Sequence, residues 1–140
     1  MNPVKAITQF LQERLEATAP EGDTLHNRIA MDRIPPDFAN SESAIEIQIQ
    51  SGGQPMAEMP VTRYQVAIQC FGGTSDFDAA STVSSRVFFA LHNAVGAPAE
   101  AGLMFAQRAT TSRMYEPATG WPVVVDIYEI EILDTTGEQT

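Results

Sequence analysis

The sequence predicts one α+β domain: a mostly antiparallel sheet of four to five strands with two main helices, in the order α-β-β-β-α-β-β. Three observations predict it. The chain has 140 residues, a length typical of one domain. Two segments repeat apolar residues at helical spacing, and several others alternate apolar and polar residues as half-buried strands do. Since there is no internal repeat or linker, residues 1–140 are expected to form a single domain, with 134–140 frayed.

The first helix is predicted to begin near Pro3, which suits a first helical position, with Asn2 as its cap. Its apolar face repeats every three or four residues, at Val4, Ile7, Leu11 and Leu15. Pro20 and Gly22 are expected to end it after about four turns.

Three strands are predicted to follow. The first spans Arg28–Ile34. The second, "AIEIQIQSGG", places isoleucines on one side and Glu or Gln on the other, which is typical of an antiparallel sheet with one solvated face. A Gly-, Pro- and Met-rich loop, Ser51–Pro60, leads to the third strand, "VTRYQVAIQCF". Its predicted buried side carries Tyr64, Val66, Ile68 and Cys70.

The segment "FGGTSDFD" joins this strand to the second helix, an arrangement also found in phosphate-binding loops. Such a loop needs a lysine to reach the phosphates. Here the lysine is missing, and Asp76 and Asp78 would repel a phosphate. We therefore interpret the segment as a structural corner, in which Gly72 and Gly73 reverse the chain and Ser75 forms a capping box with Asp78.

The second helix and two further strands complete the expected order. The apolar stripe of the helix comprises Phe77, Ala80, Val83, Val87, Phe88 and Leu91. The strand-like segments are "GLMFAQRATTSRMY" and "PVVVDIYEIEIL", joined by the turn "EPATGW". Asp126 falls on the core side of the last strand. A bulge, a sheet edge or a buried partner such as Arg63 or Arg108 would explain it.

Composition limits the possible functions. The chain carries 18 acidic and 8 basic residues, for a net charge of −10, which argues against a protein that grips nucleic acid through its phosphates. That charge does not exclude a surface that DNA slides past. No segment has the apolar length of a signal peptide or a membrane span, so we expect the protein to work or assemble in a cytoplasm.

No catalytic, metal or cofactor site is predicted, and we expect no enzyme. Cys70, the single cysteine, falls on the apolar side of its strand and is interpreted as an inert buried thiol. His26 and His92 lack partners at metal-ligand spacing. Glu129 and Glu131 share the exposed side of a strand and are interpreted as part of a solvated face.

Two predicted loops hold candidate interface residues, because Met suits adaptable contacts and Tyr and Trp are enriched at interface hot spots. Ordinary hairpin tips that fold back on the core are the alternative interpretation. The candidates are Gln54, Met56, Met59, Tyr115, Glu116 and Trp121.

An N-terminal helix followed by "SAIEIQIQSGGQP", "YQVAIQCFGGTSDFDAASTVSSRVFFALHNAVG" and "YEPATGWPVVVDIYEIEIL" resembles the tail terminator and minor-capsid-like proteins of long-tailed bacteriophages. The resemblance covers about Val4 to Leu133. It includes the helix pattern at Asp78, Ala79 or Ala80, and Leu91. It also includes the final run of Tyr128, Ile130 and Ile132.

The resemblance implies a structural virion protein of the tail neck, assembled in the host cytoplasm for a phage or a gene-transfer-agent-like particle. Such proteins form a ring, usually a hexamer, on the head-proximal end of the tail tube. The ring stops tube polymerisation and joins the tail to the head connector, so the implied partners are further copies of the chain, the tube protein and the connector protein. DNA would pass the lumen without specific binding, and neither a cofactor nor a membrane is implied.

Two alternatives stay open. One is another neck, tail-completion or tail-tube subunit of the same fold group, since tube proteins polymerise without limit and a terminator does not. The other is a small-molecule-binding or enzymatic α+β domain, which would need a closed apolar pocket with convergent polar groups. The scarcity of His, Cys and Lys disfavours the latter.

Overall fold

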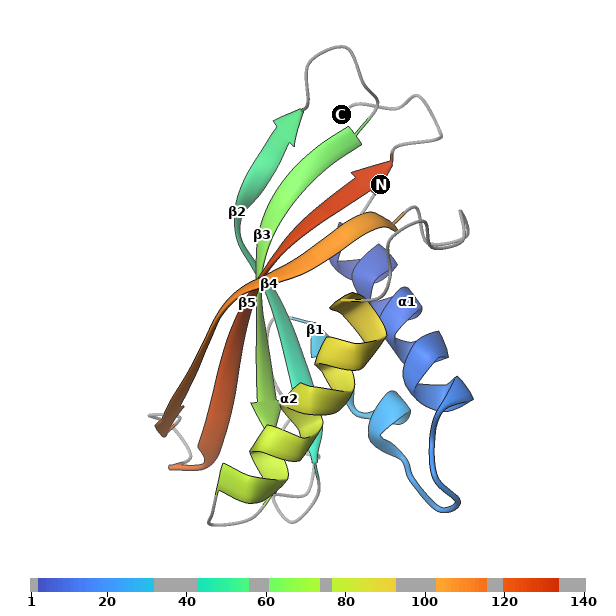
Figure 1. Cartoon of the computed structure of the whole chain (residues 1–140), viewed down its shortest axis with the longest axis vertical. Coiled ribbons are helices and arrows are strands. Elements are labelled where there is room, and N and C mark those ends of the chain that lie inside the picture. The colour runs from blue at the N-terminus through green and yellow to red at the C-terminus, as the bar shows by residue number, and fades with distance from the viewer. Residues whose placement is uncertain are drawn as a thin grey trace.

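A computed structural model describes residues 3–31, 43–55, 61–73, 77–92, 103–115 and 120–133. The elements are α1 (Pro3–Ala17), a short 3-10 helix η1 (Leu25–Asn27), β1 (Ile29–Met31), β2 (Ala44–Pro55), β3 (Val61–Phe71), α2 (Phe77–His92), β4 (Leu103–Tyr115) and β5 (Pro122–Leu133). Their order confirms the predicted α+β class (Figure 1). Within these residues, no helix combines the length and the apolar character that a membrane crossing requires.

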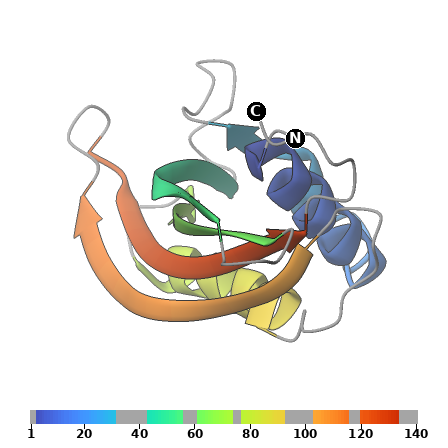
Figure 2. The same cartoon turned by 90° about the horizontal axis from the view of Figure 1, so that it is seen from above.

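The strands form one five-stranded sheet in the order β1-β2-β3-β5-β4. All neighbouring pairs are antiparallel except β1 with β2, which are parallel. The last strand of the chain, β5, therefore lies between β3 and β4. Seen from above, β4 and β5 run as nested arcs, because the sheet is strongly twisted and curled (Figure 2).

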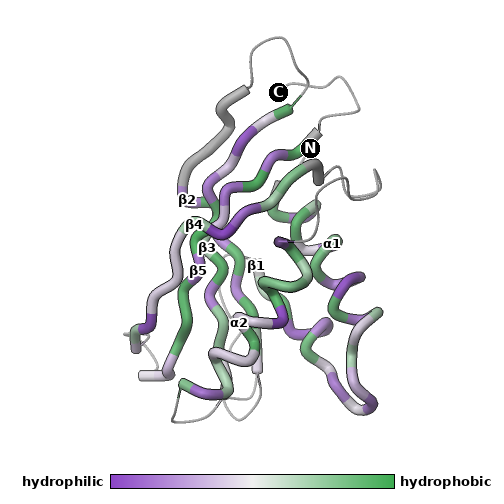
Figure 3. Tube along the Cα trace, viewed as in Figure 1, coloured by the Kyte–Doolittle hydropathy of each residue, from purple (hydrophilic) through white to green (hydrophobic). Residues whose placement is uncertain are grey.

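Both helices pack on one face of the sheet, side by side, and the main core lies beneath them (Figure 1). The predicted apolar faces are confirmed except at Phe88, which is half-buried and lies outside this core, between Arg108 and His92. Figure 3 shows hydrophobic and hydrophilic residues alternating along the strands. The helices contribute Ile7, Leu11, Leu15, Val83, Val87 and Leu91 to this core. The sheet contributes Ile45, Ile47, Val66, Ile68, Tyr128 and Ile130, all fully buried.

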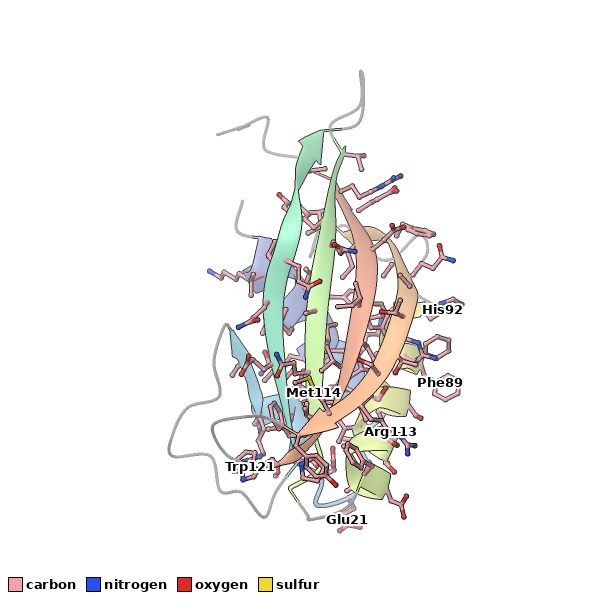
Figure 4. The ribbon with its side chains drawn as sticks, turned by 90° about the vertical axis from the view of Figure 1, so that its left-hand side faces the viewer. Glu21, Phe89, His92, Arg113, Met114 and Trp121 are labelled. Carbon is pink, nitrogen blue, oxygen red and sulfur yellow. The ribbon has the colours of Figure 1, made fainter. Side chains whose placement is uncertain are left out.

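The opposite face of the sheet carries a second, smaller apolar cluster at one end. Ala44, Phe71 and Val123 are buried there, with Trp121 and Val125 packed against them. None of the described helices lies on this face (Figure 4). The sheet thus has one helix-covered face and one face on which polar residues and this small cluster alternate.

The predicted loop Ser51–Pro60 is wrong in its first half, because β2 continues to Pro55. The strand absorbs its two glycines through register shifts between Ile49 and Ser51 and between Gly52 and Gln54. Such bulges let a strand continue through residues that would otherwise weaken it. Residues 56–60 lie outside the described part. Of the first predicted strand, Arg28–Ile34, the structure confirms Ile29–Met31, and residues 32–34 lie outside the described part.

The corner between β3 and α2 confirms the role predicted for Gly73. Gly73 has φ 75°, a left-handed conformation that glycine adopts without steric cost. Gly72 is needed for a different reason: a Cβ there would collide with the backbone of Ala80 and the methyl group of Ala79. The start of α2 therefore packs directly on the end of β3. Ser75, the predicted cap, lies outside the described residues.

Candidate functional site

The predicted interface residues that the structure describes are spread over the sheet. Tyr115 is the last residue of β4, is 61% exposed, and meets the ring of Phe77 edge-on at 5.2 Å between centroids. Trp121 is half-buried and meets the ring of Phe71 edge-on at 5.7 Å. Phe77 belongs to α2, whereas Phe71 belongs to the small cluster on the other face of the sheet. Tyr115 and Trp121 therefore pack on opposite faces of the sheet.

Gln54 lies far from both aromatic residues. It belongs to β2 and pairs with Arg63 of β3, whereas Tyr115 pairs with Pro122 at the other end of the sheet. Met56, Met59 and Glu116 lie outside the described residues. The structure therefore does not gather the described candidates into one site.

A surface that the sequence interpretation missed lies where α2 meets the edge strand β4. The guanidinium carbon of Arg108 lies 4.3 Å from the centre of the Phe88 ring, and that ring stacks on His92 at 4.5 Å. Further along β4, Arg113 lies over the ring of Phe77 at 5.6 Å. We call this surface the α2–β4 face, and it comprises Phe88, Phe89, His92, Arg108, Arg113 and Tyr115.

The α2–β4 face is also where apolar side chains meet solvent. Among the described residues, the exposed large hydrophobic side chains are Phe89 at 67%, Tyr115 at 61% and Met114 at 45%. Phe89 and Tyr115 lie on the α2–β4 face, whereas Met114 points to the opposite face of the sheet, where its pairing partner Val123 lies. Figure 4 shows Phe89, His92 and Arg113 along one side of the molecule, beside β4. A sequence signal existed, because Phe89 falls outside the buried stripe of its helix.

An open groove of about 490 Å³ runs between α2 and β4 within the same region. Hydroxyl groups and a guanidinium line much of it, among them those of Ser81, Ser85, Thr111 and Arg113. Arg113 donates a long hydrogen bond of 3.4 Å to the Ser81 hydroxyl across it. The groove is open, unlike the closed pocket that a small-molecule site needs.

Asp126 is completely buried on the helix-covered side, and its partner is not the arginine considered from the sequence. The Ser84 hydroxyl of α2 donates a 2.5 Å hydrogen bond to its Oδ2. Arg63 instead donates to Glu131 at 2.9 Å, and Arg108 lies over Phe88. β5 is neither an edge strand nor bulged at this residue. The Asp126 Oδ1 atom has no hydrogen-bond partner among the described residues.

Two further ionisable groups, the Cys70 thiol and the Tyr128 hydroxyl, are buried near Asp126. Burial, and then the neighbouring Asp126, raise the pKa of the Cys70 thiol well above its usual value. The same two causes, in the same order, raise the pKa of the Tyr128 hydroxyl. Arg108 opposes both shifts only weakly. At neutral pH both groups are therefore protonated, and the Cys70 thiol is a poor nucleophile, as expected for an inert buried cysteine.

The histidines are separated in the structure. His26 lies in η1, where its Nε2 is 3.6 Å from Glu16 of α1 and its Nδ1 is buried without a hydrogen-bond partner in the described part. His92 ends α2 and stacks on Phe88. Across the described ranges, no group of three His, Cys, Asp or Glu side chains could hold a metal ion.

Comparison with known proteins finds similarity only at the level of structure. No model of a known protein family matches the sequence, and no curated protein matches it. A chain in the solved structure described as "Virion of native gene transfer agent (GTA) particle" has a similar fold, with a TM-score of 0.68. The match covers 93% of this chain and 96% of the virion chain at 13% identity. The two chains therefore share one fold over nearly their whole lengths.

Proposed function

We propose that this chain is a structural subunit of a phage-like particle. The observation that supports the proposal is the fold shared with the gene transfer agent virion chain, which spans almost all of both proteins. A virion subunit acts through its surfaces, so no catalytic residue is assigned.

Within such a particle, we assign the chain to the tail terminator. Copies of it would form a ring, with six subunits as the expected number, on the head-proximal end of the tail tube. The ring would stop tube polymerisation and present the surface that binds the head connector. The sequence resemblance to phage tail terminators supports this role specifically, whereas the shared fold supports the broader one.

A ring suits the physical properties of the molecule. Rings are built from heterologous contacts, in which one surface of a subunit meets a different surface of the next. The two edge strands of the sheet are the three-residue β1 and the thirteen-residue β4, so its two edges differ. A net charge of −10 would also let DNA pass a central opening without adhering to it.

Another neck, tail-completion or tail-tube subunit is the second candidate. The same structural match supports it, because the description of the virion does not say which part of the particle the matched chain forms. The two candidates differ in one property that can be observed. A tube subunit is needed to build a tube, and a terminator is needed to stop one.

Tail length separates these roles. The tail genes of the parent particle would be expressed with and without this chain, and the tubes measured by negative-stain electron microscopy. We expect overlong tubes of scattered length, unattached to heads, when the chain is absent, and normal length when it is restored from a second plasmid. Absence of tubes would indicate a tube subunit, and tubes of normal fixed length would contradict the terminator role.

A further inference from the structure

We propose that the α2–β4 face binds a second copy of this chain, and that its counterpart on that copy is the acidic outer side of α1, formed by Glu13 and Glu16. This inference rests on the proposed ring, since it names the surface by which one subunit would hold the next. Four properties of the face support it.

The first is exposed apolar area. Phe89 and Tyr115 are each more than half exposed. Single exposed hydrophobic residues are ordinary on a protein surface, but here two of the three large ones described lie on the α2–β4 face. Aromatic residues and arginines are the side chains enriched at the centres of protein interfaces.

The second is charge. The segments α2 and β4 contain Arg86, Arg108 and Arg113 but only one carboxylate, that of Asp78 in the first turn of α2. The rest of the chain therefore carries 5 of the 8 basic and 17 of the 18 acidic residues. A cationic face on so acidic a protein is complementary to the remaining surface of a second copy.

The third is that two of these arginines are not paired with a carboxylate of the described residues. Arg86 is neutralised by Asp23, to which it donates two hydrogen bonds of 3.0 Å. Arg108 and Arg113 instead lie over aromatic rings and contact no carboxylate among the described residues. Stacking restricts both side chains before any partner binds, so less entropy is lost when a carboxylate pairs with them.

The fourth is the edge of the sheet. On one side β4 pairs with β5 along its length, and on the other it pairs with no described strand. An exposed edge strand of 13 residues presents unpaired backbone groups, which natural proteins usually cover. A neighbouring subunit held on the α2–β4 face would cover this edge.

The acidic counterpart lies on the other helix, which packs beside α2. Glu13 and Glu16 are exposed on α1, and the Glu16 side chain is 68% accessible. In Figure 4, α1 lies behind the β2 side of the sheet and α2 behind the β4 side. Because the two surfaces consist of different residues, their contact is head-to-tail, as a closed ring requires.

Sedimentation equilibrium of the purified chain tests this assignment. We expect concentration-dependent self-association of the wild-type chain, weakened about tenfold or more by Phe89→Glu and, separately, by Glu13→Arg combined with Glu16→Arg. The matched control Gln50→Glu adds the same charge at an exposed residue of β2 and should associate like the wild type. Circular dichroism melting would verify that each variant is folded.

Mixing the two impaired variants gives the sharper result. Each keeps one intact half of a head-to-tail contact, so an equimolar mixture should form a 1:1 dimer that neither variant forms alone. A wild-type chain that stays monomeric at every concentration reached, a Phe89→Glu variant that associates normally, or a mixture that stays monomeric would overturn the proposal.

These outcomes are independent of the tail-length experiment. Overlong tails in the absence of the chain, together with normal association of Phe89→Glu, would leave the terminator role intact and reject this face. Impaired association of Phe89→Glu, together with normal tails in the absence of the chain, would support the face and reject the terminator role.

Discussion

At the scale of single residues, the buried carboxylate of Asp126 is the feature that distinguishes this core from a purely apolar one. The sequence predicted its burial from its place among Val124 and Tyr128, but not its partner. Ser84 was overlooked, although it lies four residues after Ala80 and belongs to the buried side of α2. A hydroxyl at a core position of a helix is therefore the signal that could have identified the partner.

Replacing Ser84 with alanine should destabilise the fold by about 1–3 kcal/mol, because Asp126 would lose the single hydrogen bond described for it while remaining buried. Ser85→Ala, at the exposed neighbouring position, should change the free energy of unfolding by less than about 0.5 kcal/mol. Urea denaturation of both variants and the wild type would measure the free energies of unfolding. Equal effects would show that the Ser84 hydrogen bond adds nothing.

Cys70 and Tyr128 should make the protein sensitive to alkali. Their pKa values are raised in the folded state, so above the unfolded pKa the folded state holds more protons than the unfolded state, and stability falls with rising pH. The loss should begin near pH 8.5, the usual pKa of a thiol, and steepen near pH 10, that of a phenol. Thermal melting between pH 7 and 11 would measure it.

The variants Cys70→Ala and Tyr128→Phe separate these two contributions. Cys70→Ala should remove the part of the decline that starts near the thiol pKa, and Tyr128→Phe the part near the phenol pKa. Each variant is compared with its own stability at pH 7, so a constant cost of the substitution does not affect the result. A decline that is unchanged in both would assign alkaline sensitivity to other groups.

At the scale of elements, most boundaries could be predicted because each pattern has one dominant cause. The isoleucine alternation of β2 and the buried stripe of α2 follow directly from burial on one side. The extension of β2 to Pro55 could not be predicted, since "SGGQP" has the composition of a loop and becomes strand only through pairing with β3. The α2–β4 face was missed for a related reason: it joins residues from two elements whose adjacency is set by β5.

The β3–α2 corner should tolerate no side chain at Gly72. Gly72→Ala would force the new methyl group into the backbone of Ala80, so the start of α2 must move away from the sheet, at a cost of about 3 kcal/mol. Gly120→Ala is the control, because Gly120 has φ 72° and open space around it, and only the backbone strain of about 1–2 kcal/mol applies. Thermal denaturation of the two variants would rank them, and a milder effect at Gly72 would contradict the collision.

At the scale of the whole molecule, one ion pair joins the N-terminal part to the rest. Asp23, in the turn between α1 and η1, accepts two hydrogen bonds from Arg86 in the middle of α2. The residues involved are 63 positions apart in the chain. This contact and the apolar packing between α1 and α2 hold together two parts of the fold that otherwise meet mainly through the sheet.

Acid should weaken this junction. Hydrogen bonding from Arg86 lowers the pKa of Asp23, so the pair adds stability above the unfolded pKa near 3.9, and this contribution is lost as the pH falls through the lower folded pKa. Arg86→Leu should cost about 0.5–1 kcal/mol at pH 7 and much less at pH 2. Urea denaturation of both proteins at the two pH values would test it; a difference that is independent of pH would attribute the effect to packing.

The position of β5 in the sheet has a consequence for synthesis. β3 and β4 are made before β5, but each has β5 as a neighbour, and β3 ends about 50 residues before β5 begins. Until β5 has left the ribosome, β4 has no partner strand and the main core lacks Tyr128, Ile130 and Ile132. Folding therefore requires β5 to pair with strands that are distant in the sequence, and such long-range pairing slows folding. Nascent chains that stall before Pro122 cannot complete the sheet, so an unfinished subunit is excluded from any assembly that recognises the folded surface.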